Sequence, residues 1–153
     1  MIEFVLDCSV AISWCLVDED NDYANAVLDI MPNAEAFVPE IWSLEIVNTL
    51  PVAERRNRMT VEQTQASINW LQSLLITIDS LTSVQAFGRT LTLAREQKLA
   101  SYDAAYLELA LRLDLPLATN DKQLIDAALR CQVELLNPAL NGSSVCLMQR
   151  TGL

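Results

Sequence analysis

The sequence predicts an α/β sandwich around a mostly parallel sheet. Short apolar segments rich in β-favouring residues alternate along the chain with longer segments whose apolar residues recur at helical spacing. This alternation is typical of parallel strands covered by helices. With 153 residues, 52% of them apolar, the chain has the size and composition of a single globular domain with a substantial core.

Five short apolar segments are expected to form the strands. Each is too short for an independent helix, and each ends at or just before an aspartate, an asparagine or a proline. The segments are 2–6, 36–38, 76–79, 116–119 and 133–136.

The stretches between these segments carry helical spacing and helix-start signals. Ser9 is placed to cap the first helix, and Thr60 with Gln63 three residues later has the pattern of a capping box. Pro51 predicts a kink or a break in the helix that contains it. The expected helices cover 9–16, 23–31, 39–56, a long stretch after Thr60, 83–98, 101–113 and 122–130. We expect residues 1–137 to form one domain and residues 138–153 to form an irregular tail.

Two absences narrow the chemistry. The chain has no histidine, which excludes nucleophile systems that use a histidine base, as well as the histidine-containing zinc proteases. None of its three glycines lies in GxGxxG or GxxxxGK[ST], so the Rossmann and P-loop phosphate cradles are excluded too. An enzyme of this composition must therefore depend on carboxylates, thiols, hydroxyls or a metal ion.

The cysteines and the first residues predict a cellular setting. The four cysteines form no CxxC pair, which argues against zinc-ribbon and thioredoxin-like sites and favours a reducing, cytoplasmic environment. The start, MIEFVLD, contains two acids and no base, so we expect no ordinary signal peptide. Because no apolar run reaches about 18 residues, we also expect no membrane span.

The charge of the chain is negative and unevenly distributed. The net charge is −10, and all 10 basic residues lie from Arg55 onward, while 11 of the 20 acids precede that position. A protein of this kind does not bind nucleic acid through a broad basic field. A local basic cluster together with bound divalent cations would be needed, and a basic protein partner is an alternative.

Acidic residues follow several of the expected strands. In parallel sheets, sites form just beyond the carboxyl ends of the strands, and Asp7, Asp79 and Asp121 occupy such positions. Glu45 lies in an apolar helical turn, where a carboxylate is costly to bury, and Asp103 lies in the first turn of a helix. Each also has a structural interpretation: helix capping for Asp7 and Asp121, outward exposure for Glu45, and helix-dipole complementarity for Asp103.

If Asp7, Glu45, Asp103 and Asp121 converge, their charges repel one another unless a cation lies between them. Oxygen ligands without histidine or cysteine select Mg²⁺ or Mn²⁺. Such an ion suits phosphoryl chemistry, because it activates a water and neutralises developing charge on phosphate.

Four motifs of the chain resemble those of a known family, the PIN-domain ribonucleases, and among them the VapC-type toxins of toxin–antitoxin pairs. The resemblance rests on four motifs in the expected order: VLDCSV (5–10), PEIWSLEIVNTL (39–50), SYDAAYLELA (101–110) and LATND (117–121). It implies a three-layer α/β/α fold and a metal-dependent, single-strand-selective endoribonuclease that cleaves RNA with Mg²⁺ or Mn²⁺. It also implies a homodimer that is neutralised by a small antitoxin protein.

The resemblance implies roles for individual residues. The acidic quartet that binds the metal and acts in catalysis would be Asp7, Glu45, Asp103 and Asp121. Ser9 and Thr119 would orient carboxylates or waters, and Asn48 would help to organise the site.

The cluster Arg55, Arg56 and Arg58 is the one concentration of positive charge, and we expect it either to contact RNA phosphates or to be a solvated helix end. Two other functions stay open: a non-catalytic interaction module with the same fold, and a carboxylate-based phosphatase. The second lacks support because Ser9 stands where a haloacid-dehalogenase-like motif has its second aspartate.

Overall fold

The computed structural model describes residues 1–140 and is built around one parallel sheet. Four strands pair in the order β3-β2-β1-β4, all of them parallel. The strands are β1 (Ile2–Leu6), β2 (Ala34–Pro39), β3 (Ile76–Asp79) and β4 (Leu117–Ala118). The expected α/β class and mostly parallel sheet are therefore confirmed. Within residues 1–140, no helix combines the length and the apolar character needed to cross a lipid bilayer.

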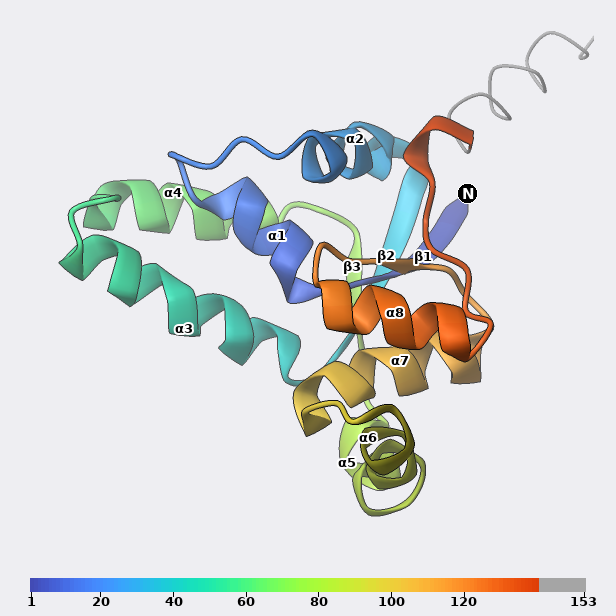
Figure 1. Cartoon of the computed structure of the whole chain (residues 1–153). Helices are drawn as coiled ribbons and strands as arrows, with labels where there is room; N and C mark the ends of the chain where they lie inside the picture. The colour runs from blue at the N-terminus through green and yellow to red at the C-terminus, as the bar shows by residue number, and fades with distance from the viewer. Residues whose placement is uncertain (141–153) are drawn as a thin grey trace, which may run out of the picture.

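Helices cover both faces of this sheet. The connections from β1 to β2 and from β2 to β3 move in one direction across the sheet, and the connection from β3 to β4 moves back. Because such crossovers are right-handed, the two sets of helices lie on opposite faces. Figure 1 shows α1, α2 and α4 grouped together and α7 and α8 packed side by side away from them, in agreement with the contacts between elements. The three-layer arrangement implied by the resemblance is thus confirmed.

The helices correspond closely to the expected ones. They are α1 (Cys8–Cys15), α2 (Asp22–Ile30), α3 (Trp42–Arg55), α4 (Val61–Leu71), α5 (Thr82–Gln85), α6 (Leu91–Gln97), α7 (Ser101–Leu113) and α8 (Lys122–Arg130). A 3₁₀ turn (Met31–Asn33) precedes β2, and a π-helical turn (Ala86–Thr90) joins α5 to α6 where the sequence predicts one helix. Thr60 and Gln63 form the expected capping box at the start of α4.

The core includes the central strands and the inward sides of the helices that cover both faces of the sheet. Phe4, Val5 and Leu6 of β1 are fully buried, which accounts for the uninterrupted apolar sequence of this central strand. From Ala104 to Ala110 every residue of α7 is buried, so this helix crosses the middle of one sheet face. The first turn of α7 is consequently held in a fixed position beside the carboxyl ends of the strands.

Three local expectations are corrected. Asp7, not Ser9, occupies the N-cap position of α1, and Ser9 lies inside the helix. The break at Pro51 does not occur: α3 continues through it, because both Pro51 and Val47, whose carbonyl loses its partner, are exposed to water. The fifth strand is reduced to a single bridge between Leu117 and Leu135.

The predicted tail from residue 138 lies mostly outside the described residues. Residues 138–140 begin a helical turn, and residues 141–153 are not described.

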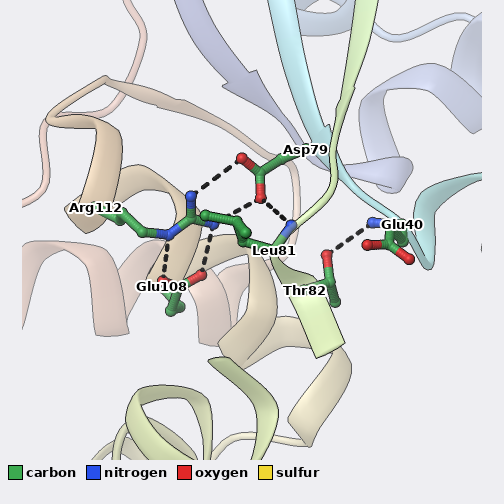
Figure 2. A network of polar contacts seen from close by, with 6 residues as sticks. All are labelled: Glu40, Asp79, Leu81, Thr82, Glu108 and Arg112. Carbon is green, nitrogen blue, oxygen red and sulfur yellow. Dashed lines mark hydrogen bonds and ion pairs between the residues drawn. The ribbon is translucent and has the colours of Figure 1, made fainter. Parts of the chain in front are cut away.

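A buried polar network ties α7 to the end of β3. The guanidinium of Arg112 donates two hydrogen bonds to the carboxylate of Asp79, at 2.8 and 3.1 Å, and two to that of Glu108, at 2.7 and 3.2 Å (Figure 2). Close by, the backbone amide of Glu40 donates to the hydroxyl of Thr82 at 2.9 Å. Asp79, one of the strand-end aspartates, is thus held by an arginine and is not available to a cation site.

Removing this arginine should destabilise the protein. In Arg112→Gln, we expect the free energy of unfolding to fall by about 2 kcal/mol, because the buried carboxylate of Glu108 loses its cation. Arg112 also holds the pKa of Asp79 below its ordinary value of 3.8. A lowered pKa stabilises the fold above about pH 4 and ceases to do so in more acidic solution. The loss of unfolding free energy in Arg112→Gln should therefore become smaller as the pH is lowered.

Urea denaturation between pH 3 and pH 7, analysed by linear extrapolation to water, measures this change in the free energy of unfolding. Arg130→Gln is the matched control, because Arg130 is exposed and its guanidinium donates to Gln97 and to no carboxylate among residues 1–140. Equal losses in the two variants would contradict a special role for Arg112.

Candidate functional site: a carboxylate cluster at the end of the sheet

Asp7 lies at the carboxyl end of β1, where the strand passes into α1. Its side chain is only 2% exposed and does not cap the helix. Instead its Oδ2 accepts hydrogen bonds from the hydroxyls of Ser9, at 2.5 Å, and Thr119, at 2.8 Å. Two neutral donors therefore fix the orientation of this carboxylate.

The same hydroxyls connect the ends of β1 and β4. The backbone amide of Asn120 donates to Ser9 Oγ at 3.0 Å, and that of Asp121 donates to Thr119 Oγ1 at 3.0 Å. Asp121 is the N-cap of α8, and its Oδ1 accepts the amide of Leu124 at 3.0 Å. The predicted capping role of Asp121 is thus present, and among residues 1–140 no group donates a hydrogen bond to the other carboxylate oxygen, Oδ2.

Glu45 reaches the site from the first turn of α3. Its Oε1 accepts the phenolic hydroxyl of Tyr106 at 2.8 Å, and its Oε2 accepts the thiol of Cys8 at 3.4 Å. The expectation that Glu45 faces away from the protein is not met, since its side chain is partly buried against these two residues.

Asp103 lies in the first turn of α7. It is half-buried, and among residues 1–140 no hydrogen bond or ion pair engages its carboxylate. Burial, and after it the negative charges of Asp121, Asp7 and Glu45, together raise its pKa from 3.8 to about 6. Asp103 therefore lies within electrostatic reach of the other three carboxylates.

The four carboxylates, Asp7, Glu45, Asp103 and Asp121, are called the carboxylate cluster below. Burial also raises the pKa of Asp7, and the charge of Asp121 adds to this increase. Burial likewise raises the pKa of Glu45, and the charge of Asp7 adds to that increase. No arginine or lysine lowers the pKa of Asp7, Glu45 or Asp103. Within residues 1–140, the cluster is thus a concentration of negative charge with no cationic side chain paired to it.

The cluster is not a closed metal cage. In the part of the chain that the structure describes, no three cysteine, aspartate or glutamate side chains stand together in the arrangement of a formed metal site. Three of the four carboxylates already accept hydrogen bonds: Asp7 from Ser9 and Thr119, Glu45 from Tyr106 and Cys8, and Asp121 from the first turn of α8. Mg²⁺ usually keeps several waters and is bound through one or two carboxylates, so direct contact with three is not required.

The remaining predicted residues have different environments. Asn48 lines an open cavity of about 760 Å³ that also contains Glu45 and Cys8, and it makes no hydrogen bond among the described residues. Arg58 forms a bidentate ion pair with Asp18 at 2.9 Å, so its charge is already compensated.

Arg55 and Arg56 are exposed. They lie at the far end of α3, about 15 Å from Glu45 along the helix axis, given ten residues at 1.5 Å each.

Two residues of the site, Cys8 and Tyr106, were not identified from the sequence. Tyr106 follows Asp103 by three residues, which places both on the same side of α7. This spacing was the one feature of the sequence from which Tyr106 could have been identified as a residue of the site. Cys8 belongs to no CxxC pair and so gave no signal of its own, although its neighbour Asp7 marks the end of the strand.

The fold was compared with known proteins. No protein-family model and no curated protein matches the sequence. Among solved structures, PAE2754 from Pyrobaculum aerophilum is 20% identical, with a TM-score of 0.61, over 82% of this chain and 86% of that one. FitAcB from Neisseria gonorrhoeae is 20% identical, with a TM-score of 0.59, over 88% and 97%. VapBC2 from Rickettsia felis, bound to a promoter DNA fragment, is 16% identical, with a TM-score of 0.57, over 89% and 98%.

The chain has the PIN-like fold. The likeness covers most of every chain compared, and it confirms the fold that the four motifs implied. At this level of identity it establishes the PIN-like architecture, whereas the chemistry of the site must be argued from the residues themselves.

Convergence of the carboxylates predicts that Asp103→Asn stabilises the metal-free protein. A carboxyl group whose pKa is raised in the folded state stays protonated there at a pH at which it already ionises in the unfolded state. The free energy of unfolding therefore falls as the pH rises from 3.8 to about 6 and stays lowered above that range. We expect Asp103→Asn to gain about 1 kcal/mol at pH 7 in EDTA, allowing for solvent screening, and to gain nothing near pH 4.

Urea denaturation at the two pH values tests this, with Asp126→Asn on the exposed side of α8 as the control. A destabilised Asp103→Asn protein at pH 7 would show that the charge of Asp103 is compensated by some other group.

Proposed function

We propose that this protein is a metal-dependent endoribonuclease of the PIN type and the toxin of a toxin–antitoxin pair. The observation that carries the proposal is the carboxylate cluster, which brings together acidic side chains from the end of β1, α3, α7 and the end of β4. The pKa values of Asp7, Glu45 and Asp103 are raised by burial and by the neighbouring carboxylates, and no cationic side chain of residues 1–140 pairs with the cluster. Such an arrangement is unfavourable by itself and becomes favourable when a cation binds.

The donor set fits a hard divalent ion. Each member of the cluster offers carboxylate oxygen, and the chain has no histidine, so Mg²⁺ or Mn²⁺ is favoured over softer metals. Asp7 and Asp103 would hold the ion directly or through water, and Glu45 and Asp121 would hold its waters or a second ion. When bound, the ion would activate a water and stabilise charge on the scissile phosphate.

The residues around the cluster would fix the orientation of its carboxylates for this reaction. Ser9 and Thr119 both donate to Oδ2 of Asp7, which restricts its rotation and leaves Oδ1 free of side-chain donors. The half-buried position of Asp103 beside three other carboxylates suits it to a cation, because binding relieves both its burial and the repulsion.

RNA is the substrate class that the site and its surroundings suit best. The open cavity beside Glu45 would admit an unpaired strand, and it is lined by Asn48, Thr49 and Tyr102, which offer polar and aromatic contacts. Arg55 and Arg56 would contact phosphates further along the strand. The net charge of −10 means that the bound ion must supply much of the attraction for phosphate.

An antitoxin partner is supported by the kinds of protein that share the fold. One structural neighbour is a toxin–antitoxin complex from Klebsiella pneumoniae, 20% identical with a TM-score of 0.59 over 88% of this chain and 97% of that one. In this chain, α3, α4 and β3 enclose an apolar cavity of about 450 Å³ that includes Trp42, whose indole nitrogen has no hydrogen-bond partner. A basic, amphipathic segment of the antitoxin would complement this cavity and the acidic surface.

A homodimer acting in the cytoplasm completes the proposal. Exposed apolar side chains at Val84 and Phe87 supply a surface that a second copy would cover.

The test of the proposal is metal-dependent cleavage. We expect the wild-type protein to cut single-stranded RNA with Mg²⁺ or Mn²⁺, to stop in EDTA, and to lose at least about a hundredfold in rate in Asp7→Asn, because charge stabilisation by the ion is a dominant contribution. Cleavage is measured on end-labelled RNA, and circular dichroism verifies the fold of the variant. Asp29→Asn, on the exposed side of α2, is the matched control and should keep full activity.

Binding of the ion is measured separately. Mn²⁺ should raise the melting temperature of the wild type and raise that of Asp7→Asn much less, since a ligand of the native state stabilises it. Stabilisation without cleavage of any RNA would favour the non-catalytic interaction module. Full cleavage by Asp7→Asn would reject the assignment of the site.

A further inference from the structure

We propose that Cys8 and Tyr106 are positioning residues that hold the carboxylate of Glu45 in the orientation needed for metal binding. The inference rests on the proposed function and deepens it, because it assigns roles to two residues that do not belong to the carboxylate cluster. The two side chains donate to opposite oxygens of one carboxylate: Tyr106 to Oε1 at 2.8 Å and Cys8 to Oε2 at 3.4 Å.

Tyr106 is suited to this task because it cannot move. It is fully buried in the middle of α7, where it is among the largest buried side chains of the core. Its hydroxyl is its single polar group, and Glu45 is the partner that receives its hydrogen. A phenol fixed in this way defines where the carboxylate of Glu45 can lie.

Cys8 provides the second constraint from a different element. It is the first residue of α1, directly after Asp7, so its thiol reaches Glu45 from the same strand end that carries the buried aspartate. Three elements, α1, α3 and α7, therefore meet at one carboxylate. With both oxygens engaged, rotation about the terminal bond of Glu45 is restricted.

The two hydrogen bonds hold Glu45 in place against electrostatic repulsion by Asp7. The charge of Asp7 acts on Glu45, and no cationic side chain among the described residues holds Glu45 near the cluster. A glutamate has several rotatable bonds and would otherwise turn into the open cavity beside it. The phenol and the thiol keep it within the cluster while leaving its charge intact.

A purely structural role makes a different prediction. If Tyr106 only satisfied a buried hydroxyl, its removal would lower stability and leave metal affinity unchanged. If it acts through Glu45, its removal weakens metal binding, and the effect disappears once Glu45 has itself been replaced.

The experiment measures Mn²⁺ affinity by isothermal titration calorimetry in the absence of RNA, with the rate of RNA cleavage as a second readout. The variants are Tyr106→Phe, Cys8→Ala and Cys8→Ser, each in the wild-type and in the Glu45→Gln background. Tyr23→Phe is the matched control for the phenol, because Tyr23 donates a hydrogen bond of the same length, 2.8 Å, to the carbonyl of Leu136 away from the cluster. Cys131→Ala is the control for the thiol, since Cys131 is likewise a free, partly buried cysteine.

We expect Tyr106→Phe to weaken Mn²⁺ binding about tenfold and Cys8→Ala a few-fold, consistent with the usual effect of groups that orient a metal ligand and with the weaker donor capacity of a thiol. Cys8→Ser should restore affinity, because its hydroxyl also donates. In Glu45→Gln, none of these substitutions should change affinity further. Cleavage should fall through kcat at saturating RNA, while KM for RNA changes little.

Three results would overturn the inference. Unchanged Mn²⁺ affinity in Tyr106→Phe, with only a loss of stability like that of Tyr23→Phe, would leave Tyr106 a structural residue. Equal losses in the wild-type and Glu45→Gln backgrounds would show that neither donor acts through Glu45. Failure of the wild-type protein itself to bind Mn²⁺ would reject the proposed function, and this inference with it.

Discussion

The organisation of this protein depends on the repulsion among four carboxylates that the fold forces together. A parallel sheet brings the ends of β1 and β4 side by side, and the two helix starts of α3 and α7 approach the same edge. Core packing fixes these positions, because β1 and the middle of α7 are fully buried. The side chains therefore cannot separate without disturbing the core, and the unfavourable charge is retained in the folded state.

Much of the fold could be predicted from local sequence because its signals are local. The apolar run before Asp7 identifies the central strand, and Thr60 with Gln63 identifies the start of α4 through a capping box. The errors arose where tertiary context decides. The segment around Leu135 has strand-like composition but forms only one bridge to Leu117, and α3 passes through Pro51 because water can satisfy the freed carbonyl.

The site could be predicted only in part for a related reason. Strand-end position and motif order point to Asp7 and Asp121, but strand-end position also singled out Asp79, which Arg112 in the last turn of α7 neutralises. That pairing joins residues 33 positions apart and has no sequence signature. The contacts of Glu45 with Cys8 and Tyr106 span 37 and 61 positions, so they became visible only in three dimensions.

The chain treats its carboxylates in two distinct ways, and the difference bears on function. Elsewhere in the described residues, several carboxylates are paired with arginine: Arg112 binds Asp79 and Glu108, and Arg58 binds Asp18. In the cluster, by contrast, orientation comes from neutral donors, the hydroxyls of Ser9, Thr119 and Tyr106 and the thiol of Cys8. A guanidinium would orient a carboxylate equally well but would also cancel its charge and occupy the place of a metal ion. Neutral donors fix the geometry and preserve the negative potential, which is the combination that a cation-binding site requires.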